Sequence, residues 1–300
     1  MRKVQIVIFI LIILLSMAAC SSDTEPKSTL SGKIVFQGIT PDGAIDVYTV
    51  DADGKNLVAL TTGDSIDGCP TWSPDGTRIA FESNRDSADD KPDIYVMDAN
   101  GSNVVRLTDH AAHDSAPAWS PDGTRIAFVS GREGDLRDIF TMNADGTGVT
   151  RVTDEVGNVD NPDWSPDGEW IVFESWYGTG FVYNYQIFKI KPDGSNLKQL
   201  TREGGDHRRP KWSPDGKDIM YVVDFAGSWD IATMWDTGAT QKKLTDTHNA
   251  SEDSPFWSPD GAQIVYARGH TFYGMKPDGT KVHELFEVEG LSIVCPSWHP

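Results

Sequence analysis

Positive charge is scarce in this 300-residue chain, which has 26 lysines and arginines against 45 aspartates and glutamates and a formal net charge of −19. So acidic a chain repels phosphate backbones, which argues against nucleic acid as a partner. Sequence motifs of common enzymes are lacking too: there is no GxSxG, no HExxH and no glycine-rich phosphate loop. Cysteine is rare, with three residues in all. These absences exclude several catalytic classes and favour a binding role.

Long apolar runs are absent except at the start, where residues 4–15 are almost entirely apolar and follow Arg2 and Lys3. Small residues and then Cys20 come next. This pattern is typical of a bacterial lipoprotein signal peptide, residues 1–20, cut before a lipidated (palmitate-bearing) Cys20. An ordinary signal peptide with an incidental cysteine is the alternative. Either way we expect export, and with the lipid a membrane anchor at the cell surface or the periplasmic face.

Residues 21–31 are small and polar and predict a flexible tether. The remaining residues, 32–300, are enough for one all-β domain with a large core.

An internal repeat dominates this domain. The string WSPDG begins at five tryptophans, and a truncated sixth copy ends the chain; a proline stands two residues before each tryptophan. The spacings are 47, 45, 48, 45 and 41 residues, from Trp72, Trp119, Trp164, Trp212, Trp257 and Trp298. Each period reads as four short strands separated by turns rich in proline, aspartate and glycine. Four strands in about 45 residues are typical of a β-propeller blade.

The two ends of the domain complement each other. Residues 33–62 read as second, third and fourth strands without a first, whereas residues 294–300 read as a first strand alone. Together they make one blade, so we predict an all-β fold: a six-bladed propeller closed by the C-terminal strand joining the N-terminal blade. Such closure removes the open sheet edges. A closed ring without edges also favours a monomer.

Cys69 and Cys295 each stand three residues before their tryptophan, on the first strands of adjacent blades. In an oxidising compartment this predicts a disulfide that fastens the ring. Two buried free thiols are the alternative.

The pattern xPxWSPDGxxIxF…DIY…DG…LT, from about residue 32 to the end, resembles the TolB-type propeller family. The resemblance implies a six-bladed propeller, in agreement with the repeat count. The chain differs from TolB in having a short tether where TolB has an α/β domain, and in the expected lipid anchor. The role of TolB in an envelope system is therefore not carried over. Similar propellers also occur in oligogalacturonate lyases.

The connections on the face opposite the WSPDG turns, the top face, vary from blade to blade, and such variation marks the expected binding face. The loop SWYGTGFVYNYQ in the fourth blade contains Trp176 and Tyr177, and the fifth blade adds Phe225 and Trp229. Exposed aromatic residues with polar tips suit contacts with an envelope protein or a glycan. Ordinary packing between blades is the alternative for aromatic residues at alternate positions.

A basic cluster lies close to these aromatics in the repeat: His207, Arg208 and Arg209. Arg209 shares the register of Cys69 and Cys295 with Asn161, Ala116 and Ser254. We expect this ring of six residues to line the top mouth of a central channel, where Arg209 can grip a carboxylate.

Metal binding is only weakly indicated. The acidic loops 86–93 and 250–253 offer oxygen ligands for Ca²⁺, but without EF-hand spacing. Histidines 110, 113, 207, 248 and 270 fall in top loops, where convergence on a metal would favour a lyase-like carbohydrate enzyme. We expect no catalytic residue, no obligatory cofactor and a binding or scaffold module.

Overall fold

The computed structural model describes residues 30–154, 156–179, 182–202, 204–225, 227–247 and 251–300. The expected signal peptide, Cys20 and nearly all of the tether lie outside these residues. Within them, no helix is long and apolar enough to cross a membrane.

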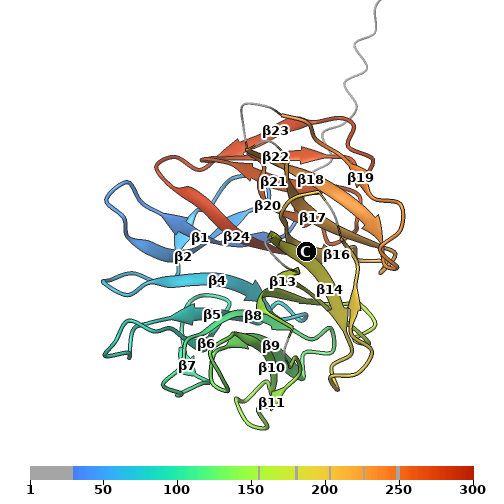
Figure 1. Ribbon diagram of the computed structural model, residues 1–300. Coiled ribbons are helices and arrows are strands. Elements are labelled where there is room, and N and C mark those ends of the chain that lie inside the picture. The colour runs from blue at the N-terminus through green and yellow to red at the C-terminus, as the bar shows by residue number, and fades with distance from the viewer. Residues whose placement is uncertain (1–29, 155, 180–181, 203, 226, 248–250) are drawn as a thin grey trace, which may run out of the picture.

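In the described part of the chain, twenty-four strands form six antiparallel sheets of four, arranged in a ring (Figure 1). Each sheet is one blade, and we number the blades 1 to 6 along the chain. The inner three strands of blades 2 to 6 are β4 (Asp67–Trp72), β5 (Arg78–Ser83), β6 (Asp93–Asp98); β8 (Asp114–Trp119), β9 (Arg125–Ser130), β10 (Asp138–Asn143); β12 (Asn158–Trp164), β13 (Ile171–Thr179), β14 (Val182–Ile190); β16 (His207–Trp212), β17 (Asp218–Phe225), β18 (Ser228–Trp235); β20 (Asp253–Trp257), β21 (Ile264–Arg268), β22 (Thr271–Met275). The outer strands of these blades are β7 (Val105–Arg106), β11 (Thr150–Arg151), β15 (Lys198–Gln199), β19 (Lys242–Lys243) and β23 (His283–Glu287).

Blade 1 closes the ring as predicted. It combines β1 (Lys33–Ile39), β2 (Ile45–Asp51) and β3 (Val58–Ala59) with the last strand, β24 (Ser292–His299). Strand β24 pairs with β1 from Lys33 opposite His299 to Ile39 opposite Ser292, and Figure 1 shows the two strands side by side. The six-bladed propeller with four antiparallel strands per blade is therefore confirmed.

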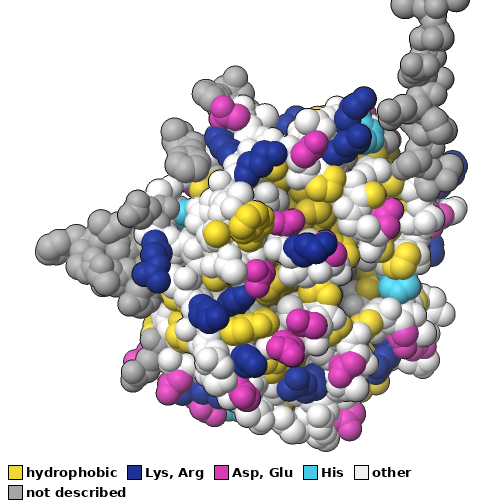
Figure 2. Space-filling model, turned by 90° about the vertical axis from the view of Figure 1, so that its right-hand side faces the viewer, with side chains coloured by type: hydrophobic (Ala, Val, Ile, Leu, Met, Phe, Trp, Pro, Cys, Tyr) yellow, Lys and Arg dark blue, Asp and Glu magenta, His cyan; other side chains and the backbone are white. Residues whose placement is uncertain are grey.

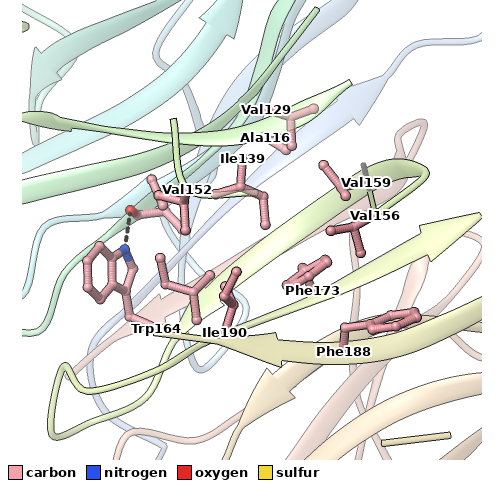
Figure 3. Close-up of a cluster of buried hydrophobic side chains, with 13 residues drawn as sticks. Ala116, Val129, Ile139, Val152, Val156, Val159, Trp164, Phe173, Phe188 and Ile190 are labelled. Atoms are coloured by element: carbon pink, nitrogen blue, oxygen red, sulfur yellow. Dashed lines mark hydrogen bonds between the residues drawn. The ribbon is translucent and has the colours of Figure 1, made fainter. Parts of the chain in front are cut away.

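The hydrophobic core lies between neighbouring blades. Figure 3 shows one such layer, in which Val129 and Ile139 of blade 3 meet Phe173 and Ile190 of blade 4. Trp164 closes this layer, and its indole Nε1 donates to the carbonyl of Ala118 at 3.2 Å. Repeat tryptophans of blades 2 to 5 are buried, whereas Trp257 and Trp298 are partly buried and pack at the edges of their clusters.

The WSPDG turn is stabilised by its own side chains. In blade 2, Ser73 Oγ donates to Asp75 Oδ1 at 2.6 Å and accepts from the Arg78 amide at 2.9 Å. Gly76 takes the left-handed conformation, with φ of 66°. The bond from Ser73 is the main cause that lowers the pKa of Asp75 to about 2. Each turn therefore satisfies its polar groups locally, which explains why the string repeats.

The DIY and LT motifs also have a physical role. Thr108 Oγ1, in the outer part of blade 2, donates to the buried Asp93 at 3.1 Å and accepts from the Ile94 amide at 3.0 Å. Thr153 makes the same two contacts with Asp138 and Ile139 in blade 3. The pair ties the chain just after each two-residue outer strand to the third strand of its blade.

Candidate functional site

A channel runs along the centre of the ring and is lined by the first strands of the blades. It encloses a cavity of about 280 Å³. The lining includes one residue at the same register in every blade, three before the repeat tryptophan: Cys69, Ala116, Asn161, Arg209, Ser254 and Cys295. We call these six residues the channel ring.

Every residue of the channel ring lies in the left-handed region, with φ between 44° for Cys69 and 54° for Arg209. The pairing of first and second strands shifts at this place in each blade, from Gly68 to Thr71 in blade 2, for example. The ring residue and the proline after it thus form a β-bulge. Proline has no amide to donate, so the bulge explains why it is tolerated on an inner strand.

The cavity extends from the channel ring toward the WSPDG turns, because Trp212, Pro214, Trp257 and Pro259 also line it. The sequence suggested a ring at the top mouth of the channel. The open volume reaches from the ring toward the opposite, turn-bearing side, and the placement of the ring at the top mouth stays a prediction. The repeat predicts which residues form the ring, but it does not predict on which side of the ring the cavity lies.

Polar side chains above the channel ring join neighbouring blades. The Ala116 amide donates to Glu82 Oε2 at 2.9 Å, and the Arg209 amide donates to Glu174 Oε2. Gln37 in blade 1 accepts from Cys69 in the same way, at 3.2 Å. In each case the acceptor stands on the second strand of the preceding blade. We call Gln37, Glu82 and Glu174 the blade staples.

Burial raises the pKa of both Glu82 and Glu174 to about 7, with the nearby Asp160 adding to the effect in each. Sequence analysis missed these residues. Their signal is a glutamine or glutamate in strands whose other copies carry valine or alanine at the same place, as in KIVFQ, RIAFE and RIAFV.

Arg209 reaches across to blade 6, where its Nη1 donates to Ser254 Oγ at 2.8 Å. The same oxygen accepts from the Cys295 amide at 3.3 Å. Asn161 is the other predicted ligand-binding residue of the channel ring. Its backbone N–H donates to Asp160 Oδ1 at 2.9 Å. Asp160 also forms an ion pair with Arg137 at 3.2 Å. Both predicted residues thus belong to a hydrogen-bonded layer around the channel.

Arg208 lies differently, among aromatic rings. Its guanidinium carbon is 3.6 Å from the ring centre of Tyr185 and 5.5 Å from that of Trp229. Its Nη2 is 3.6 Å from Asp206, and its Nε is buried without a hydrogen-bond partner among the described residues. Trp176 stands opposite Tyr185 in the β13–β14 pairing and is 42% exposed. We call Trp176, Tyr185, Arg208 and Trp229 the aromatic–arginine cluster.

Three of the predicted residues remain: His207, Tyr177 and Phe225. His207 is buried, 3% exposed, with Nδ1 3.1 Å from the carbonyl of Gly205, and burial lowers its pKa. It therefore lies beneath the surface rather than on the expected top-face site, because its strand turns it toward Tyr221. Tyr177 and Phe225 belong to β13 and β17, but their side chains lie outside the described part of the structure.

The acidic loops that suggested Ca²⁺ have protein partners. Asp86 accepts from the Tyr95 hydroxyl at 2.8 Å, and Asp89 forms an ion pair with Lys91 at 2.8 Å. Glu252 pairs with Arg268. Across the described ranges, no three His, Cys, Asp or Glu side chains are grouped to hold a metal ion. His248 of the proposed histidine set lies outside those ranges.

Charges of both signs alternate over the side of the molecule in Figure 2, with apolar groups between them. Many buried carboxylates are neutralised by arginines from the top loops, such as Asp67 by Arg85 at 3.0 Å and Asp114 by Arg132 at 2.7 Å. These repeated pairs stabilise the blades. The Arg208–Asp206 pair is longer, at 3.6 Å.

Six four-stranded blades around a lined channel define the chain as a six-bladed β-propeller. The family model described as the TolB beta propeller domain matches residues 22–113 and 108–300. The chain belongs to this TolB β-propeller family.

Solved structures share this fold. TolB from Acinetobacter baumannii is 26% identical, with a TM-score of 0.77 over 90% of this chain and 67% of that one. The TolB structure from Agrobacterium tumefaciens is 22% identical, with a TM-score of 0.53 over 89% and 90%. An oligogalacturonate lyase from Vibrio parahaemolyticus shares the fold at 14% identity, with a TM-score of 0.55 over 85% and 73%.

Proposed function

We propose that this chain is a non-catalytic binding module of the cell envelope, exported and lipid-anchored through Cys20, which holds a protein partner through the aromatic–arginine cluster. The similarity to TolB proteins supports an extracytoplasmic role. The lipid anchor rests on the sequence pattern around Cys20, and a monomer rests on the closed ring.

The observation that carries the proposal is the placement of Arg208. An arginine stacked on Tyr185 and close to Trp229 is held in one orientation, so little side-chain entropy is lost when it meets a ligand. Tryptophan, tyrosine and arginine are the residues that dominate binding energy at protein interfaces. The exposed Trp176 extends this set over the neighbouring strand.

Charge narrows the chemistry of the partner. Arg208 is a third exposed, and its ion pair with Asp206 is loose at 3.6 Å. A carboxylate from a partner can displace that contact and bind two guanidinium donors at once. We therefore favour an acidic segment of an envelope protein, with an acidic glycan as the alternative ligand of the same cluster.

The test is capture from solubilised envelope with the lipidated protein, beside a Trp176→Ala/Arg208→Ala variant. We expect a protein that the wild type retains and the variant loses. A Trp235→Ala variant is the matched control, because Trp235 is 54% exposed at the turn-side end of β18. Equal capture by all three proteins would contradict the assignment.

Catalysis is the competing function. The fold is shared with an oligogalacturonate lyase, an enzyme named for an acidic glycan substrate. Cleavage of oligogalacturonate by the purified protein, abolished by chelation of divalent metal, would replace the binding proposal with a lyase-like enzyme.

A further inference from the structure

The two cysteines of the channel ring meet where the propeller closes. Cys295 lies on β24 of blade 1 and Cys69 on β4 of blade 2, at equivalent bulge positions. Their Sγ atoms are 2.9 Å apart, and both residues are free thiols in this structure. A disulfide needs about 2.05 Å, so a change of less than 1 Å joins them.

We propose that Cys69 and Cys295 form a reversible disulfide that locks the propeller at its closure. Strand β24 supplies the inner strand of blade 1, and among the described strands it pairs only with β1. The bond ties this strand covalently to blade 2. It closes a loop across 226 positions of the chain, and long loops are those whose cross-linking restricts the unfolded chain most.

The two thiols are not equivalent. The contact with Cys69 lowers the pKa of Cys295, and Arg209 contributes in the same direction. The same contact, together with burial, raises the pKa of Cys69. Arg209 is linked to Cys295 through the Ser254 hydroxyl, and a nearby cation favours the thiolate, which is the nucleophile in thiol–disulfide exchange. We therefore assign Cys295 as the attacking residue and Cys69 as the resolving one.

The reaction needs a disulfide oxidant, such as glutathione disulfide. The Cys295 thiolate attacks one sulfur of the oxidant, which forms a mixed disulfide and expels one thiolate. Cys69 then loses its proton and attacks Cys295 Sγ, which expels the second thiolate. The protein gives up two electrons and two protons, and the oxidant leaves as two reduced thiols.

Oxidation also fixes part of the channel lining. Ser254 Oγ accepts both from the Cys295 amide and from Arg209 Nη1. The disulfide therefore restrains a strand that is joined to Arg209 by two hydrogen bonds through Ser254.

The test uses the full chain with Cys20→Ser, so that only these two thiols remain. After treatment with glutathione disulfide, the protein with both cysteines should give a cross-linked Cys69–Cys295 peptide on proteolysis under non-reducing conditions. It should retain no glutathione adduct. Cys69→Ser should accumulate one glutathione on Cys295. Cys295→Ser should react at least tenfold more slowly. Two thiols that remain open to alkylation would overturn the disulfide. Equal rates for the two single variants would overturn the assigned order of attack.

Melting of the same protein gives a second measurement that needs no variant. The oxidised form should melt on the order of 10 °C above the reduced form. Identical melting temperatures would mean that the pair does not lock the ring.

Discussion

The carboxylates of the WSPDG turns and those of the blade staples differ in pKa, although both sets come from the same repeats. Asp75 in a turn has its pKa lowered to about 2 by donors from Ser73 and Thr77. Glu82 in a staple has its pKa raised to about 7 by burial, with one backbone donor. The hydrogen bonds of a turn lie within one blade. A staple forms its hydrogen bond with the next blade and stands where other blades carry valine or alanine. The residues that repeat in every blade stabilise the blade itself. The residues that differ between blades lie mainly where two blades meet and on the top face.

The largest effect is expected from a substitution in the part of each blade that repeats exactly. Trp164→Ala removes a buried indole and its bond to Ala118, and it should destabilise folding by about 3–5 kcal/mol. Denaturant unfolding would measure the loss. A cost below about 1 kcal/mol would mean that the blade interface does not depend on the repeat tryptophan.

The staples give the next largest effect, with a definite pH dependence. The folded pKa of Glu82 is about 7, above its ordinary value of 4.5, so the protonated form stabilises the fold. That stability is complete below pH 4.5 and is lost as the pH rises through 7. Glu82→Gln should therefore raise stability at pH 8 by about 1–3 kcal/mol and change it little at pH 4.5.

Gln37 makes this variant informative, because blade 1 already carries a glutamine at the equivalent place with the same contact to a ring amide. Chemical unfolding at the two pH values would measure the effect. A gain that does not depend on pH would show that charge burial at Glu82 is not its cause.

The turns give a smaller effect. Ser120→Ala removes the hydroxyl that accepts from the Arg125 amide at 2.9 Å and donates to Asp122 at 2.6 Å. We expect a loss of about 1 kcal/mol. The lowered pKa of Asp122 should return toward its ordinary value, since the Ser120 contact is its largest cause. NMR titration of that carboxyl would follow the change, and an unchanged pKa would contradict the local account of the turn.

The repeat predicted the fold because each blade is specified locally by its turns, its tryptophan and its alternating strands. Closure through β24 and β1 followed from the incomplete ends, and so did the adjacent positions of Cys69 and Cys295.

What the sequence could not show depends on packing between blades. The staples Glu82 and Glu174 act on amides 34 and 35 residues further along the chain. His207 lies beneath the surface, while its neighbour Arg208 lies against Tyr185. Residues adjacent in a strand point to opposite sides, and the bulge at Arg209 shifts the alternation, so the sequence did not assign each side chain its face.

We propose that function resides in the aromatic–arginine cluster and not on the repeated turns. Trp176 and Trp235 are both exposed and lie toward opposite ends of their blades, which makes them a matched pair. The most direct measurement is the affinity of the captured partner for Trp176→Ala and Trp235→Ala. We predict at least a tenfold loss for Trp176→Ala, equivalent to about 1.4 kcal/mol, and no change for Trp235→Ala. The reverse order, or equal losses, would contradict the account.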